Sequence, residues 1–230
     1  MAVNSGKKAR RATGGQTERT IEHGFKSIKP LTEAQAEYQD AIHTSDVIFG
    51  IGDAGTGKTF VAASYAAEQL FYRKVDKVIL TRPNEETGPK LGFLPGELEE
   101  KYAPYLDPFD KVFSLALGRS NYELMLKSKR IEPKPLGFMR GASFDNAIIL
   151  VDEAQNITKD AFKMLLSRIG RNCKVILSGD PDQVDINNSG LKDAVRRLGH
   201  LPGISVVEFT SDDIVRSAMC KQIILAYKNK

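Results

Sequence analysis

The sequence predicts an α/β fold, a three-layer sandwich in which helices cover both faces of a mainly parallel β-sheet. Five short apolar runs rich in β-branched residues lack the alternation of half-exposed strands, which indicates strands buried on both faces. These runs are residues 46–52, 77–81, 147–151, 174–179 and 204–209. Helical patterns lie between several of the runs, and strands that alternate with helices favour parallel pairing through right-handed crossovers.

The first predicted elements lead into a glycine-rich loop. Thr32 is typical of a helix N-cap with Gln35 three residues later. The helix after it has one apolar face, formed by Ala34, Tyr38, Ala41 and Ile42. The strand at 46–52 follows, and the glycine loop after it leads into a second predicted helix over 58–71.

The interval from 82 to 146 breaks this alternation. It is dense in Pro, Gly and charge, with a helical stretch near 108–128 and a Pro-rich turn at 132–138. A loop this long in a compact domain is usually either functional or disordered. We favour a functional loop, because it leaves the carboxyl end of a central strand, where ligands bind in open α/β sheets.

Two further helices are predicted in the second half of the chain. Thr158 could cap a helix whose apolar face is Phe162, Leu165, Leu166 and Ile169. Ser211 could cap a last helix, in which Asp212 and Asp213 would complement the positive end of the helix dipole. The apolar face of this last helix would be Val215, Ala218, Met219, Ile223 and Tyr227.

The composition suits one domain with a short extension. With 230 residues, 41% of them hydrophobic, the chain can bury one substantial core. We expect a flexible basic arm over residues 1–27 and a single domain over residues 28–230. The arm could lie on nucleic-acid phosphates or could simply be a solvated terminus. Its first 20 residues carry Lys7, Lys8, Arg10, Arg11 and Arg19 against a single acid, Glu18.

Membrane, disulfide and zinc classes are not indicated. No stretch is apolar over the roughly 18 residues that a membrane span needs, and the N-terminus lacks the apolar core of a signal peptide. We therefore expect a cytoplasmic protein. Cys173 and Cys220 are expected to be small buried hydrophobic residues. His23, His43 and His200 are too scattered to predict a zinc cluster.

The loop after the first strand carries the most specific motif. Gly52, Gly57, Lys58 and Thr59 satisfy the pattern G-x-x-x-x-G-K-[ST] between a predicted strand and a predicted helix. Backbone N–H groups would hold nucleotide phosphates, Lys58 would reach the β- and γ-oxygens, and Thr59 would ligate Mg²⁺. An ordinary glycine turn is the alternative. The expected ATP contacts are Gly52, Asp53, Ala54, Gly55, Thr56, Gly57, Lys58, Thr59 and Phe60.

Two acidic residues follow the strand at 147–151. Asp152 fits the second Mg²⁺ ligand of the site, and Glu153 fits the base that orients and activates the attacking water. Taken alone, the pair could equally belong to a surface turn. Together with the phosphate loop it predicts ATP hydrolysis, because metal and water are needed at that edge of the sheet.

A third polar segment follows the strand at 174–179. The strand ends in Ser178, Gly179 and Asp180, and Gln183 follows three residues later. The amide of Gln183 could sense the γ-phosphate and respond to its loss. A Pro-Asp turn without such a role is the alternative.

Seven segments in this order resemble the PhoH family of ATPases, which is related to the first RecA-like core of superfamily 1 helicases. The resemblance covers about residues 28–228 and implies a RecA-like P-loop NTPase fold, a hexameric ring, and action on RNA. The segments are "TEAQAEY", "GDAGTGKT", "LTRP", "LGFLPGELEEKYAPYL", "FMRGASFDNAIILVDEAQN", "LSGDPDQVD" and "DDIVRS".

The resemblance also implies roles for residues outside the loop. Gln35 would read the adenine edge, and Arg216 would contact the γ-phosphate. Arg82 and Arg140 would lie near phosphate, nucleic acid or a neighbouring subunit. For each arginine, an ordinary ion pair or helix-end contact is the alternative. Some members carry a PIN nuclease domain, but because this chain ends at Lys230 we do not expect it to cleave RNA alone.

Three classes of function follow from these residues. The first is an ATPase acting on RNA or single-stranded DNA as a homo-oligomer, since a single core needs an arginine from a neighbouring subunit to close its site. The second is a nucleotide-controlled assembly or binding module. The third, a small-molecule kinase, fits less well because a water-activating glutamate suits hydrolysis, whereas a kinase must exclude water.

Overall fold

The computed structural model describes residues 25, 27–83 and 106–228 of the chain. Most of the predicted basic arm and residues 84–105 of the long interval lie outside the described residues. Two residues of the predicted arm contact the domain. The ring of Phe25 lies 5.7 Å from that of Phe71, and Ser27 donates a hydrogen bond to Glu68. The division at residue 28 stays a prediction.

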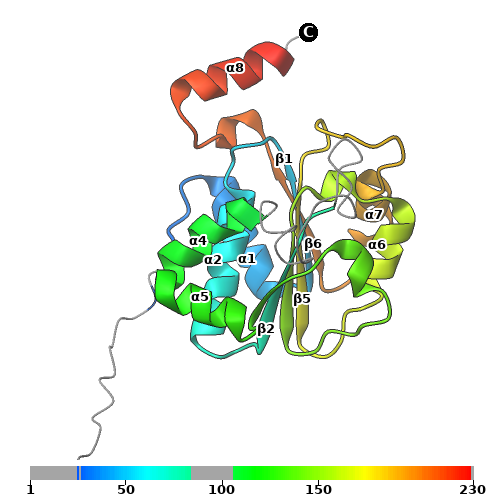
Figure 1. Ribbon diagram of the computed structural model, residues 1–230. Coiled ribbons are helices and arrows are strands. Elements are labelled where there is room, and N and C mark those ends of the chain that lie inside the picture. The colour runs from blue at the N-terminus through cyan, green and yellow to red at the C-terminus, as the bar shows by residue number, and fades with distance from the viewer. Residues whose placement is uncertain (1–24, 26, 84–105, 229–230) are drawn as a thin grey trace, which may run out of the picture.

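A six-stranded sheet forms the centre of the domain (Figure 1). Its strands are β1 (Val47–Gly52), β2 (Lys77–Thr81), β3 (Ile131–Pro133), β4 (Ala147–Val151), β5 (Cys173–Gly179) and β6 (Ile204–Phe209). They lie in the order β3-β2-β4-β5-β1-β6, and every pair is parallel. The prediction of an α/β fold with a mainly parallel sheet is confirmed.

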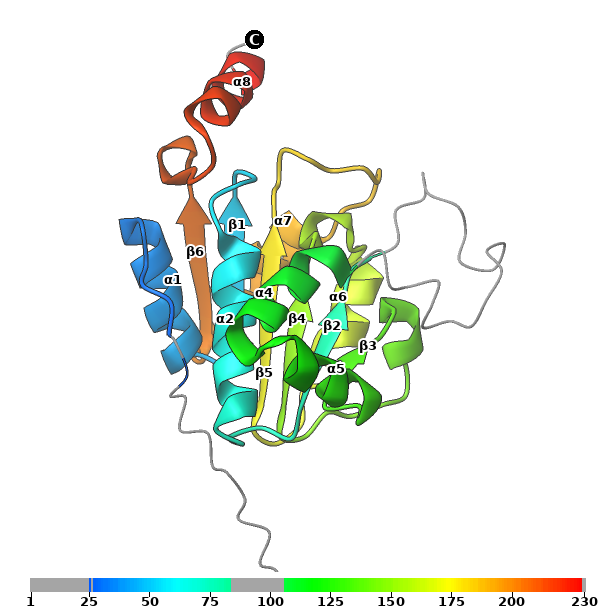
Figure 2. The ribbon, with the colours of Figure 1, turned by 60° about the vertical axis from the view of Figure 1, so that its left-hand side comes forward.

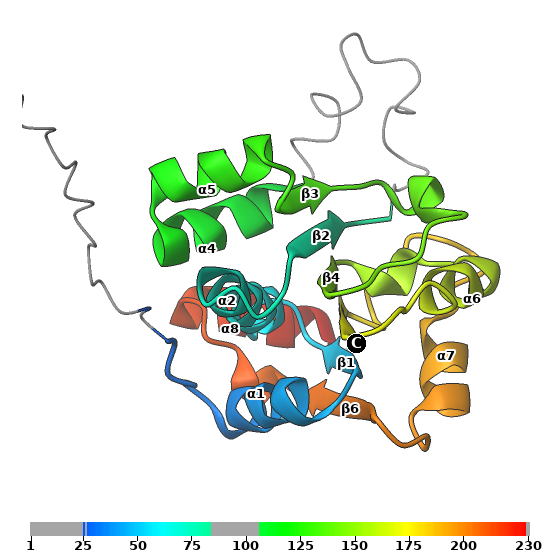
Figure 3. The same cartoon turned by 90° about the horizontal axis from the view of Figure 1, so that it is seen from below.

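Helices cover both faces of this sheet, so the three layers are also confirmed (Figures 1 and 3). One face packs against α1 (Glu33–Thr44), α2 (Lys58–Phe71), α4 (Asp107–Leu117) and α5 (Arg119–Lys127). The other face packs against α6 (Lys159–Leu166) and α7 (Leu191–Leu198). Each face has its own apolar cluster, because alternate residues of the central strands point into different layers.

Five of the six strands match the predicted runs to within one residue. The sixth, β3, was not predicted, and it replaces the first two residues of the predicted Pro-rich turn at 132–138. It is an edge strand whose Ile131 pairs with Val78 of β2. Three residues ending in Pro133 give little periodicity, and an edge strand tolerates proline because its N–H groups need no partner on the outer side.

Two predicted helix starts are confirmed by side-chain caps. The hydroxyl of Thr32 accepts a hydrogen bond from the Gln35 N–H at 3.2 Å, and that of Thr158 accepts one from the Ala161 N–H at 3.3 Å. The helix after Thr158 ends at residue 166, so Ile169 lies beyond it, although it still packs on the same apolar cluster.

The helical stretch near 108–128 consists of two helices, because Gly118 adopts a φ of +80° between α4 and α5. A side chain rarely adopts this backbone conformation, so the glycine ends one helix and begins the next. The sequence analysis did not predict α7. The apolar residues of that helix do recur at helical spacing and pack on one cluster, so the signal was present, but the helix has only eight residues.

The prediction of one long helix beginning at Ser211 is wrong. Thr210 caps a short 3₁₀ helix, η5 (Ser211–Asp213), and forms a reciprocal capping box with Asp213. The chain is then extended at Ile214, and α8 (Ala218–Lys228) begins four residues later. No residue of α8 is buried, and the helix projects beyond the carboxyl end of the sheet (Figure 2). The predicted apolar face therefore does not pack on the described part of its own chain.

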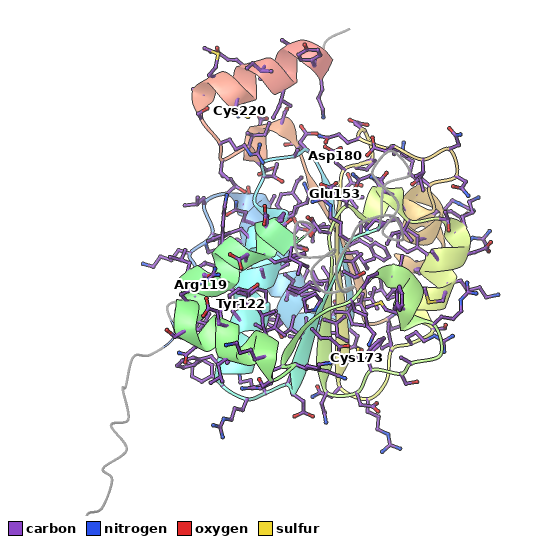
Figure 4. All side chains as sticks on the ribbon, in the orientation of Figure 1. Arg119, Tyr122, Glu153, Cys173, Asp180 and Cys220 are labelled. Atoms are coloured by element: carbon purple, nitrogen blue, oxygen red, sulfur yellow. The ribbon has the colours of Figure 1, made fainter. Side chains whose placement is uncertain are left out.

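Both cysteines are free thiols at opposite ends of the molecule (Figure 4). Cys173 is buried as predicted, and burial raises the pKa of its thiol. Cys220 lies on α8 and is only partly buried, so the prediction of a core residue is wrong there. Among the described residues, no helix combines the length and the apolar character required to traverse a lipid bilayer.

Candidate active site

The register of the sheet brings three predicted segments to one edge. Ile51 of β1 pairs with Gly179 of β5, and Val151 of β4 pairs with Leu177 of β5. The residues that follow these strands therefore meet at the carboxyl end of the sheet. Figure 4 shows Glu153 and Asp180 together at that end, with Cys173 at the other.

The loop between β1 and α2 has a shape that requires glycine. Gly52 has a φ of +130°, and a Cβ added there would lie 1.9 Å from the Phe209 carbonyl oxygen. Gly57, which precedes α2, has a φ of +87°, and a Cβ there would lie 2.7 Å from the Gln35 amide nitrogen. The N-terminal N–H groups of α2 follow this loop, and such a helix end attracts anions.

Lys58 crosses the inside of the loop. Its ammonium donates to the carbonyl oxygens of Gly52 at 2.7 Å and Asp53 at 2.6 Å, and to the Thr56 hydroxyl at 3.1 Å. The residue is 8% exposed. Burial lowers the pKa of Lys58, while nearby carboxylates, Asp180 foremost, act in the opposite direction. The ammonium is thus held among oxygen acceptors inside the loop, and its contact with phosphate stays a prediction.

Thr59 and Asp152, the two predicted Mg²⁺ ligands, lie in direct contact. The Thr59 hydroxyl donates to Asp152 Oδ1 at 2.9 Å, and Asp152 is 7% exposed. Burial raises the pKa of Asp152, and the charge of Glu153 raises it further. A buried carboxylate of this kind gains from a nearby cation, and hydroxyl and carboxylate oxygens are the ligands that Mg²⁺ prefers. The two side chains fit a magnesium ion.

Replacing Asp152 with Asn should raise the unfolding temperature of the chain without nucleotide and metal. The folded chain binds the Asp152 proton more tightly than the unfolded chain does, so the carboxylate costs stability as the pH rises through its titration. Asn removes this charge and still accepts the Thr59 hydroxyl. Scanning calorimetry at neutral pH should show a Tm a few degrees higher, since about 1 kcal/mol shifts the Tm by about 2–4 °C. A lower Tm would contradict this account of Asp152.

Glu153 adopts a backbone conformation that is unusual for a residue with a side chain. Its φ is +51°, and its carboxylate accepts hydrogen bonds from Arg82 at 3.1 Å and from the Gln155 amide at 2.6 Å. Such strain persists where surrounding contacts enforce it, and it occurs often at functional sites. The predicted base is therefore held in one position just beyond the carboxyl end of β4, and Arg82 lies beside it.

Two further residues, Asp180 and Gln155, connect the three segments. Asp180 Oδ2 accepts hydrogen bonds from the Ala54 N–H at 3.0 Å and from the Gln183 amide at 2.9 Å. The Gln155 side chain accepts from the Asp180 N–H at 2.9 Å and donates to the Gln183 carbonyl at 3.1 Å. Neither residue was predicted to have a role, and their only sequence signal is their position within "DEAQN" and "GDPDQ".

Gln35 is hydrogen-bonded to the phosphate loop. It is 4% exposed, its amide nitrogen donates to the Thr56 carbonyl at 2.8 Å, and its amide oxygen accepts from the Leu31 N–H at 2.8 Å. These bonds give Gln35 a part in holding the phosphate loop that the sequence analysis did not predict. Its contact with the adenine edge stays a prediction.

A cleft of about 450 Å³ opens over these residues. Gln183 and Arg82 line it, and so does Phe60, which is exposed near the start of α2. The side chain of Arg216 also lines it and lies against the loop, since a Cβ added at Gly55 would be 2.9 Å from Arg216 Cδ. Arg140, after η3 (Leu136–Met139), is exposed and does not belong to the cleft lining.

Comparisons with known proteins agree with this architecture. The model of the PhoH-like protein family matches residues 27–228. Protein PhoH of Escherichia coli K12 is 42% identical over 205 residues, covering 87% of this chain and 58% of that protein. The PhoH-like protein of Bacillus subtilis 168 is 43% identical over 205 residues, covering 88% of this chain and 64% of that protein. The chain thus spans less than two thirds of the length of these relatives.

A solved structure shows the same fold at low sequence identity. The large terminase of a thermophilic bacteriophage superposes with a TM-score of 0.50 at 13% identity, covering 88% of this chain and 51% of the terminase chain.

Proposed function

Since this chain belongs to the PhoH-like protein family, we propose that it binds and hydrolyses ATP with Mg²⁺, and that it acts as an oligomeric, helicase-like ATPase on RNA or single-stranded nucleic acid. One observation carries the hydrolytic part of the proposal. The hydrogen bond between Thr59 and Asp152 joins the end of the phosphate loop to the strand that bears Glu153, inside the cleft. This arrangement suits phosphoryl transfer to water.

The chain's own groups would bind and orient the nucleotide. The loop N–H groups and the positive end of α2 would hold the phosphates. The ammonium of Lys58 would exchange its bonds to Gly52 and Asp53 for bonds to phosphate oxygens. Thr59 and Asp152 would hold Mg²⁺, which when bound neutralises the charge on the phosphate oxygens.

Glu153 would act on the attacking water. Its carboxylate is held by Arg82 and Gln155, so it would accept a proton from a water molecule placed between it and the terminal phosphate. The amide of Gln183 is connected to the phosphate loop through Asp180. Loss of the terminal phosphate would thus be transmitted from the loop to the segment after β5.

The arginines divide into two groups by position. Arg216 lies against the phosphate loop of its own chain, which supports a γ-phosphate contact within the same subunit. Arg140 is exposed outside the cleft, which supports a contact with nucleic acid or with a neighbouring subunit. An arginine supplied across an interface typically raises the rate by about 10³ to 10⁵. By resemblance to the family the assembly would be a hexamer.

A second candidate is a nucleotide-controlled assembly module without unwinding activity. The apolar residues of α8 that the described part of the chain leaves exposed, which are Met219, Ile223 and Tyr227, favour it, because an exposed apolar helix face is typical of an interaction surface. In that case hydrolysis would time a change in assembly and would not depend on nucleic acid. A cytoplasmic location stays part of the proposal in both cases.

The test is phosphate release by the purified full chain, measured with and without single-stranded RNA over a range of protein concentrations that spans assembly. We expect RNA or single-stranded DNA to raise the rate several-fold and the rate per subunit to rise with assembly. Nucleotide-dependent oligomer size without nucleic-acid stimulation would favour the second candidate. A rate per subunit independent of concentration would exclude the shared site, and label transfer to a metabolite would indicate a kinase.

A further inference from the structure

Three carboxylates gather at the phosphate loop. One carboxylate oxygen from each of Asp53, Asp180 and Asp182 lies within 4.8 Å of the other two. Asp53 belongs to the loop and is 3% exposed, and Asp180 is also buried. Asp53 Oδ2 has no hydrogen-bond partner among the described residues. A buried carboxylate with an unsatisfied oxygen is costly unless a cation lies beside it.

The cation that the chain supplies there is Lys228, from the last turn of α8. Its ammonium donates to Asp53 Oδ1 and lies 3.5 Å from Asp182 Oδ2. The hydrogen bond to Asp53 raises the pKa of Lys228. Lys228 is separated from Asp53 by 175 residues of sequence, so this contact exists only while α8 remains over the loop.

Besides Lys228, α8 is held by Lys221, whose ammonium pairs with Asp212 of η5 at 3.6 Å. None of its residues is buried, and an isolated helix of this length is only marginally stable in water. The segment before it makes a second contact with the same loop, where the Val215 N–H donates to the Gly55 carbonyl at 3.1 Å. The contacts of Val215 and Lys228 thus fall on two residues of one phosphate loop, Gly55 and Asp53.

We propose that Lys228 is a positioning residue for the phosphate loop, and that the docking of α8 and the binding of nucleotide at this loop favour each other. The inference rests on the proposed nucleotide binding. A nucleotide brings negative charge to a loop that already contains Asp53, so the ammonium beside Asp53 reduces the repulsion. Because such coupling is reciprocal, bound nucleotide in turn holds α8 on the loop.

The experiment compares Lys228→Gln with Lys221→Gln and Lys228→Arg in the full chain. Lys221 is a matched control, because it lies on the same helix, carries the same charge and pairs with Asp212 at 3.6 Å. ADP affinity is measured by calorimetry, KM and kcat by phosphate release, and α8 docking by hydrogen exchange of residues 218–228 with and without ADP.

In the parent chain, ADP should slow exchange in α8. Lys228→Gln should abolish this slowing, weaken ADP binding about 5-fold or more, and raise KM while leaving kcat at saturation near the parent value. Lys228→Arg and Lys221→Gln should both retain the parent's ADP affinity and the slowing of exchange by ADP.

Several results would overturn the proposal, and they separate it from the proposed function. Lys228→Gln with the parent's affinity and the parent's ADP-dependent exchange would do so, as would an equal loss in Lys221→Gln. If the parent binds ADP but exchange in α8 does not change, the coupling alone fails. If the parent binds no nucleotide, the proposed function fails and the coupling fails with it.

Discussion

Replacing Glu153 with Gln should leave ATP binding close to that of the parent chain and lower turnover by about 10² to 10⁴. The amide has the size of the carboxylate but cannot accept a proton from water. Binding should survive, because the phosphate loop, Lys58 and the pair of Thr59 and Asp152 are all retained. Single-turnover phosphate release and equilibrium titration with ATP measure the two properties separately.

The matched control for this variant is Glu208→Gln. Glu208 lies on β6, is exposed and is outside the cleft, so the same chemical change there should leave both binding and turnover unchanged. Hydrolysis at the parent rate by Glu153→Gln would show that Glu153 is not the base.

Replacing Lys58 with Ala should remove tight ATP binding. The buried ammonium makes three hydrogen bonds across the loop, so its loss removes both a phosphate ligand and the internal support of the loop. A hydrogen bond to a charged group is worth about 1.5–3 kcal/mol, which corresponds to a loss of affinity of about 10- to 100-fold for one phosphate contact. Calorimetric titration with ATP in the presence of Mg²⁺ measures the change.

Lys192→Ala serves as the control for Lys58→Ala, since Lys192 is an exposed lysine on α7 far from the loop in sequence. It should bind ATP as the parent does. Circular dichroism and the unfolding temperature establish whether Lys58→Ala is folded. A folded Lys58→Ala chain with the parent's affinity would contradict the assignment of this lysine.

The core of the site could be predicted from the sequence because its signals are local. The spacing of Gly52, Lys58 and Thr59 depends on one turn of chain, and Asp152 directly follows a strand that is apolar on both faces. Parallel strands run in the same direction, so their carboxyl ends meet at one edge of the sheet. These features required no knowledge of long-range side-chain contacts.

The parts that were missed depend on contacts between distant segments. Gln155 and Asp180 are 25 residues apart, and their bond connects two strand ends that only the sheet order makes neighbours. The sequence pattern also favoured a helix from Ser211, but the capping box of Thr210 and Asp213 begins a short 3₁₀ helix that ends where Ile214 is extended. Because α8 is separated from the 3₁₀ helix, Lys228 forms an ion pair with Asp53, a contact that hydrophobic periodicity does not indicate.

The proposed hydrolytic site is tested most directly by phosphate release from ATP. The full parent chain and Glu153→Gln are assayed side by side, with Mg²⁺ and again with excess chelator. The account predicts Mg²⁺-dependent release by the parent, none above background with chelator, and bound but unhydrolysed ATP on Glu153→Gln. Release that persists without Mg²⁺, or that proceeds equally in both proteins, would contradict it.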